Sequence, residues 1–307
     1  MHLAEGVLPL SQAAGWTAVA LPALAWSLRG EQLAQRDAGS SSVLMAGTTS
    51  LLFAATLLPL PVPVVGATSH ICLTPVLALI VGVRRIVWPT FFVLLLQALF
   101  FAHGGLTTLG VNTMTLGLIG PLITVGLWTL LRSVGADNAL GFAIACGAGG
   151  LSVYVADAFV LGMALAEAAE PMTTFMGVLL GFAPVQIPLS ALEAVASVGI
   201  VSLLATRRAE LLPGTLRELR RIPHSIKNIS VLFLILTLPA CGYEGIDGTI
   251  FGAVAESAGR PPTDSILDLS QGEMGLAMSI LILFGLGFIA GRSWELLLGN
   301  ESDALPR

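Results

Sequence analysis

Long runs of apolar residues, separated by short polar breaks, dominate the hydrophobic pattern of this chain. A helix that crosses a bilayer needs about 20 mostly apolar residues in a row. The pattern predicts nine such spans, with the expected ranges 11–28, 42–60, 69–83, 86–102, 115–131, 138–165, 173–205, 229–242 and 273–291. The third and eighth runs are short, whereas the sixth and seventh are long and contain potential helix breakers. These breakers are Gly147, Gly149, Gly150, Pro184 and Pro188.

The composition agrees with a membrane protein. The chain is 55% hydrophobic and 11% charged, whereas a soluble domain carries about 25% charged residues. We therefore predict an all-α fold, a polytopic helical membrane bundle of about seven spans followed by a two-span C-terminal module. The single lysine, Lys227, lies outside any glycine-rich loop. This excludes a Walker A loop, so the chain cannot be its own nucleotide-driven motor.

The basic residues are predicted to lie on one side of the membrane. If the N-terminus is outside, the inner loops hold all but one of the 14 Lys and Arg residues, and Arg260 is the exception. Cytoplasmic loops of membrane proteins are enriched in Lys and Arg. Several acidic residues, among them Glu5, Glu244, Glu256 and Asp264, fall on the other side. The pattern therefore predicts a multi-pass protein of the cell (inner) membrane, with its N-terminus outside and its C-terminus in the cytoplasm.

A polar, basic stretch divides the chain. Residues 1–206 are expected to form a transmembrane domain, and residues 207–228 a cytoplasmic connector. Residues 229–307 are expected to form a module of two spans joined by an external loop at 243–272, which is polar and contains Pro261-Pro262.

The first two residues can chelate a metal ion. The Met1 amine, the His2 backbone nitrogen and the His2 imidazole can close two small chelate rings on one ion. His70 is predicted at the outer end of the third span, on the same side of the membrane, and would supply a fourth nitrogen. A planar set of four nitrogens favours Ni(II) or Cu(II). The alternative is that His2 is an ordinary surface residue and that His70 bonds to a neighbouring carbonyl group.

Several other polar residues are close enough in sequence to orient these ligands by hydrogen bonds. They are Thr68, Ser69, Gln97, His103 and Asn112. For His103 we expect a role in shaping its glycine-rich loop or in orienting a ligand, rather than a role as a ligand.

Three further ionisable residues lie elsewhere in the sequence. His224 lies in the basic connector and is expected to be solvated. Asp157 and Glu193 are acids inside predicted spans, where ionisable residues are candidates for function. Each of these acids is either structural, with Glu193 pairing with a backbone donor, or part of an ion path.

Two other classes of function compete with metal uptake by a binding component. A secondary metal transporter needs carboxylates for coupling ions near the middle of the membrane and usually has an internal repeat. The chain offers Asp157 and Glu193 for that role, but it has no evident repeat. A membrane metalloenzyme would use His70, His103 and a carboxylate, with an open coordination position and a poised base. The chain has no HExxH spacing, so we expect no enzyme.

Four sequence motifs resemble those of the CbiM/NikM family, the cobalt/nickel substrate-binding components of energy-coupling-factor (ECF) transporters. The motifs are MHLAEGVLP (1–9), GATSH (66–70), LLQALFFAHGGLTTLGVN (95–112) and QIPLSALE (186–193). They occur in consistent order and cover roughly residues 1–206. The chain departs from the family after His70, where it continues with ICLTP (71–75) in place of glycines and small residues.

The resemblance implies a membrane component that binds Ni²⁺ or Co²⁺ as the transported substrate through Met1, His2 and His70, without an organic cofactor. It also implies partners: a transmembrane coupling subunit (T component) and cytoplasmic ATPase subunits, within the lipid bilayer and without nucleic acid. Residues 225–307 resemble, more loosely, the two-span CbiN/NikN partner of this family. The residues that carry this likeness are YEGIDG (243–248) and SQGEM (270–274). The chain is thus expected to be a fusion of both subunits.

Overall fold

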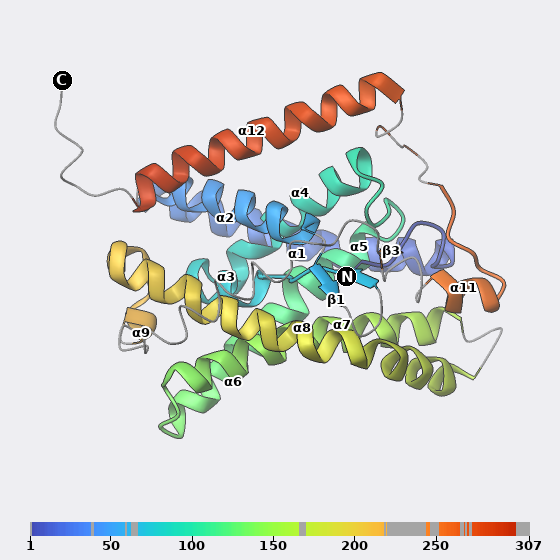
Figure 1. The fold of residues 1–307 in the computed structure, drawn as a ribbon, viewed down its shortest axis with the longest axis horizontal. Coiled ribbons are helices and arrows are strands. Elements are labelled where there is room, and N and C mark those ends of the chain that lie inside the picture. Colours follow the sequence, from blue (N-terminus) through green and yellow to red (C-terminus); the bar gives the residue numbers. More distant parts are fainter. Residues whose placement is uncertain are drawn as a thin grey trace.

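The computed structural model contains a helical bundle whose long helices run along the longest axis of the molecule (Figure 1). The structure describes residues 2–37, 40–58, 60–62, 67–165, 170–217, 219, 244–245, 252–264, 267, 269 and 272–298. The predicted eighth span at 229–242, and the residues Met1 and His224, lie outside the described residues.

Helices form most of the described chain, which confirms the predicted all-α membrane bundle. They are α1 (Leu10–Asp37), α2 (Ser40–Leu57), α3 (Thr74–Val81), α4 (Val83–Phe100), α5 (Leu109–Met114), α6 (Gly120–Ser133), α7 (Ala139–Ala164), α8 (Pro171–Arg207), α9 (Gly214–Arg217), α11 (Ala253–Ser257) and α12 (Gly272–Leu298). A π-helical turn, η1 (Thr115–Ile119), joins α5 to α6, and a 3₁₀ turn, η2 (Ala209–Leu211), follows α8.

Among the described residues, four helical segments are long and apolar enough to cross a membrane. They are Val83–Phe100, Leu109–Ser133, Ala139–Ala164 and Pro171–Arg207. Helices α4, α7 and α8 begin and end within three residues of the spans predicted from the sequence. Helix α12 lies across α2 on one face of the bundle, as Figure 1 shows, and it also contacts α4.

The third predicted span, at 69–83, is wrong. Its only helix, α3, has eight residues, which is too short to cross a bilayer. Two short antiparallel strands precede it, β1 (Leu60–Val62) and β2 (Ala67–Ser69), and β3 (Glu244–Gly245) pairs with β2 in parallel. The run is apolar because α3 is buried against α4, α6 and α7. Irregular backbone at membrane depth is tolerated where protein surrounds it.

The glycines and prolines that were expected to interrupt the sixth and seventh spans do not break them, because α7 and α8 are each continuous. The glycines instead permit close packing. A Cβ atom on Gly149 would lie 1.8 Å from Thr124 Oγ1, and one on Gly150 would lie 2.3 Å from Glu193 Oε2. Close packing through small residues is common between membrane helices.

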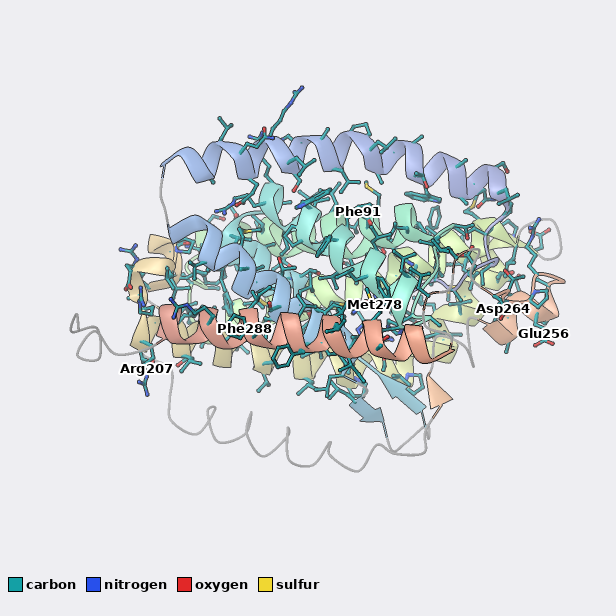
Figure 2. The ribbon with its side chains drawn as sticks, turned by 90° about the horizontal axis from the view of Figure 1, so that it is seen from above. Phe91, Arg207, Glu256, Asp264, Met278 and Phe288 are labelled. Atoms are coloured by element: carbon teal, nitrogen blue, oxygen red, sulfur yellow. The ribbon has the colours of Figure 1, made fainter. Side chains whose placement is uncertain are left out.

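The two ends of the long axis differ in charge. Figure 2 shows Arg207, at the end of α8, at one end of the molecule, and Glu256 and Asp264 at the opposite end. At the Arg207 end, Arg85 at the start of α4 forms a 2.8 Å ion pair with Glu31 near the end of α1. Arg207 and the two acids Glu256 and Asp264 therefore lie at opposite ends of the described bundle, although the Arg207 end also holds Glu31.

Candidate metal centre

Three histidines from distant parts of the chain lie together. The candidate ligand nitrogens of His2, His70 and His103 are all within 4.8 Å of one another. His2 Nδ1 lies 2.8 Å from His103 Nε2. The rings of His2 and His70 are stacked, with centroids 4.8 Å apart, and the His103 ring stands edge-on to that of His2 at 4.5 Å. Each imidazole can give one nitrogen to a shared ion.

The cluster is shielded from water. His2 is 1% exposed and His70 is 4% exposed, whereas His103 is partly buried. Burial, with the charge of neighbouring groups as a smaller cause, lowers the pKa of His2 and of His70 well below the usual value for histidine. Both rings are therefore uncharged near neutral pH, and uncharged imidazole is the form that binds metal ions.

The N-terminal segment (residues 2–8) reaches this position because its apolar side chains are buried in the bundle. Leu3 and Val7 are fully buried and pack in a cluster with residues of α5, α7 and α8. The backbone of Leu3 is also fixed by side chains. Its N–H donates to Asn112 Oδ1 at 2.9 Å, and its carbonyl oxygen accepts from Asn112 Nδ2 at 3.1 Å and from Thr108 Oγ1 at 2.6 Å. The residue that follows His2 is therefore held through both its N–H and its carbonyl group.

Glu5 connects the N-terminal segment to the loop that carries His103. This carboxyl group is 4% exposed and accepts from the backbone N–H of Leu106 at 2.6 Å, and from the N–H and hydroxyl group of Thr107. Gly105 leaves room for this approach, since a Cβ atom there would lie 2.7 Å from the Glu5 Cα. Charge-assisted bonds of this kind are stronger than neutral ones.

The loop after α4 turns sharply to present His103. The N–H groups of Phe101 and His103 both donate to the Gln97 carbonyl oxygen, and Ala102 between them has a left-handed backbone with φ 47°. The Gln97 side chain donates to Thr56 Oγ1 at 2.7 Å. Gln97 thus bonds to the His103 loop through its backbone and to helix α2 through its side chain.

The His70 segment (residues 69–73) runs from β2 to α3. Ser69 is buried, and its hydroxyl group has no hydrogen-bond partner among the described residues. Thr68 lies in β2, and the structure describes its backbone alone. At the end of the segment, the N–H of Leu73 donates to Glu193 Oε1 at 2.7 Å. Glu193 therefore pairs with a backbone donor, one of the two alternatives that the sequence left open.

Described parts of the C-terminal region contact the N-terminal segment and the elements that immediately precede His70 and the His103 loop. Strand β3 pairs with β2, which immediately precedes His70. The N–H of Thr263 donates to the Glu5 carbonyl oxygen at 3.0 Å. Near the His103 loop, the N–H of Leu269 donates to the Leu99 carbonyl oxygen, and Ser279 Oγ donates to that of Phe100.

Sequence reasoning identified His2, His70 and Asn112 as members of one site, and the structure brings these residues together. It expected His103 to shape its loop or to orient a ligand, and the His103 ring contacts His2 directly. It did not include Glu5 in the site, and in the structure this side chain is buried and bonded to the His103 loop. The available signal was that Glu5 is the only acidic residue among the apolar residues that follow His2 in the N-terminal segment.

Comparison with known proteins agrees with this fold. The sequence profile of the family CbiM, described as "Cobalt uptake substrate-specific transmembrane region", matches residues 2–211. A protein of Geobacter sulfurreducens named "Cobalt transport protein CbiM" is 32% identical over 322 residues, covering 98% of this chain and 91% of the relative. A protein of the same name from Sorangium cellulosum is 36% identical over 212 residues, covering 69% of this chain and 94% of the relative.

A solved structure, "Crystal Structure of an Truncated Transition metal Transporter", shares the fold, with a TM-score of 0.58 and 24% identity. The match covers 67% of this chain and 99% of that one. The sequence match extends over more than half of the chain and includes all three clustered histidines. The protein is therefore a metal transporter and not an enzyme, and the chain belongs to the CbiM family.

Proposed function

We propose that this chain is the substrate-binding membrane component of an uptake transporter for Ni²⁺ or Co²⁺. The observation that carries the proposal is the cluster of three imidazoles, two of them buried, which the helical bundle brings together from distant parts of the chain. Imidazole suits both ions. The names of the relatives, which refer to cobalt transport, support the same substrate class.

The ligands that we propose are the Met1 amine, the His2 amide nitrogen, the His2 imidazole and the His70 imidazole. A chelate that includes the His2 amide can use only Nδ1 of the same ring, because Nε2 points away from the backbone. His2 Nδ1 is the atom that faces His103 Nε2 at 2.8 Å. Two nitrogens bound to one ion at about 2.0–2.1 Å and at a right angle are separated by nearly this distance. His103 is therefore close enough to share the ion or to orient the His2 ring.

The energy for uptake would come from other subunits. The sequence has no Walker A loop, so ATP hydrolysis requires a partner. The resemblance to ECF transporters supplies the candidates, a transmembrane coupling subunit and cytoplasmic ATPases. The contacts of Thr263 with the N-terminal segment, of β3 with β2 and of Leu269 with the end of α4 support a C-terminal module at 229–307 that adjoins the metal centre in the same chain.

We further propose that the metal centre faces the outside of the cell membrane. The Arg207 end would then be cytoplasmic and the Glu256 end external, following the positive-inside rule. Cysteines introduced at Thr215 and Ser257, both exposed positions, test this orientation. A membrane-impermeant thiol reagent should label the cysteine at 257 in intact cells and the cysteine at 215 only after lysis. Labelling of both cysteines in intact cells would contradict the proposal.

The binding site itself is tested by comparing His70→Ala with His224→Ala. The first change removes a clustered imidazole, whereas the second alters a histidine of the predicted connector. We expect the purified His70 variant to lose high-affinity Ni²⁺ and Co²⁺, and the His224 variant to bind like the native protein. His103→Ala should lose about 10–100-fold in affinity if His103 orients a ligand. Equal metal content in the His70 and His224 variants would remove His70 from the site.

A further inference from the structure

The His70 segment ends in a backbone conformation that is unfavourable for its residue. Leu73 has φ 55°, in the left-handed region that residues with a Cβ atom rarely occupy. Leu73 and Ala102 are the two non-glycine residues with positive φ in the described chain, and each lies within three residues of a clustered histidine. Strained conformations persist only where surrounding contacts hold them, and they often occur at functional sites.

A carboxyl group from another helix holds this turn. Leu73 is the N-cap residue of α3, and no side chain of its own segment caps that helix. Instead, Glu193 of α8 accepts the Leu73 N–H at 2.7 Å, and the Cys72 N–H also hydrogen-bonds to the same carboxyl group. Successive N–H groups that end in a left-handed residue form a concave site for an anionic group. Glu193 is 2% exposed and occupies that site.

Helix α7 fixes the other side of the carboxyl group. A Cβ atom on Gly150 would lie 2.3 Å from Glu193 Oε2 and 3.0 Å from its Cδ, so only glycine leaves room for the side chain here. Gly147, one turn earlier on α7, faces α8 through different atoms, since its Cβ would meet Ser190 and Ala194. The position of Glu193 is therefore determined by α7, α8 and the start of α3 together.

We propose that Glu193 is a positioning residue for the metal centre: by fixing the Cys72–Leu73 turn, it sets the direction in which His70 presents its imidazole. The inference rests on the proposed function, in which His70 binds the transported ion. Glu193 would then influence metal affinity without touching the ion, because its carboxyl group bonds to the backbone of Leu73, three residues after His70. Packing between α7 and α8 would also become a determinant of affinity.

Three variants of the full chain test this role against a matched control. Glu193→Ala removes the acceptor, and Gly150→Ala displaces the carboxyl group without changing it. Both should weaken Ni²⁺ and Co²⁺ binding about 10–100-fold, as is typical for groups that orient a ligand. Glu193→Gln keeps an oxygen for the Leu73 N–H and should lose less. Gly147→Ala alters the same helix interface away from the carboxyl group and should bind within about twofold of native. Affinity is measured by titration against a competing chelator, together with the ligand-field spectrum of bound Ni²⁺ or Co²⁺.

A double-mutant cycle separates positioning from a general structural effect. If Glu193 acts through His70, Glu193→Ala should cause little further loss of affinity in a His70→Ala background, because coupled residues are not additive. A full, additive loss of affinity in that background would overturn the inference. Native affinity in both Glu193→Ala and Gly150→Ala would also overturn it, provided that His70→Ala fails to bind. Native affinity of His70→Ala itself would instead contradict the proposed function. If Glu193→Ala does not fold, Glu193→Gln and Gly150→Ala decide the question.

Discussion

The N-terminal segment and the His70 segment bring histidines into one cluster, but the bundle holds them in different ways. The N-terminal segment carries its own buried carboxyl group, Glu5, and it is also bonded by Asn112 and Thr108. The His70 segment carries no acid, and the carboxyl group that fixes its end is Glu193 of helix α8. Several side chains therefore fix the N-terminal segment, whereas the carboxyl group of Glu193 fixes the end of the His70 segment.

Both arrangements use a glycine beside the carboxyl-bearing residue, but the two glycines differ in what surrounds them. A Cβ atom on Gly105 would meet the backbone of Glu5 at 2.7 Å. A Cβ atom on Gly150 would meet the end of the Glu193 side chain. A side chain can rotate away from such a clash, but a packed backbone segment must move as a whole. Substitution of Gly105 is therefore expected to disturb the metal centre more.

The largest effect is expected for Gly105→Ala, which forces the His103 loop away from the N-terminal segment. We predict a loss of metal affinity of about 100-fold, the upper end of the range for groups that orient ligands. Chelator titration of the purified chain measures it. Gly126→Ala is the control, because a Cβ atom there meets nothing within 4 Å. Native affinity in the Gly105 variant would show that the two segments are not held as a unit.

A smaller effect is expected for Asn112→Ala, because Thr108 continues to hold the Leu3 carbonyl oxygen. The loss of the two Asn112 bonds should lower metal affinity about tenfold. The double variant with Thr108→Val should lose more than the sum of the single losses, since the two side chains share one acceptor. Strict additivity in the same titration would contradict the idea that these bonds support one another.

Much of the fold was predictable because membrane helices require long apolar runs, and α4, α7 and α8 end within three residues of the predicted limits. The third span failed because an apolar run does not tell burial in protein from burial in lipid. The apolar residues of α3 face other helices. Gly147, Pro184 and Pro188 signal helix breaks locally, but packing within the bundle keeps α7 and α8 continuous.

The site was predictable only in part, for a related reason. His2 and His70 could be placed on one side of the membrane by counting spans and charges. The contacts that orient them join residues about one hundred positions apart, such as Leu3 with Asn112 and Leu73 with Glu193. No local pattern encodes such pairs. The left-handed conformation of Leu73 likewise had no signal, since leucine is not a residue that favours it.

The most direct test of the proposed metal centre is the amount of Ni²⁺ or Co²⁺ bound by the purified chain, with its native N-terminus and with one residue inserted between Met1 and His2. The insertion keeps every side chain but enlarges a chelate ring. We predict that the native chain binds metal stoichiometrically and that the inserted chain loses most of it, while its thermal unfolding stays similar because no apolar span is touched. If the inserted chain binds like the native one, the N-terminal chelate is wrong.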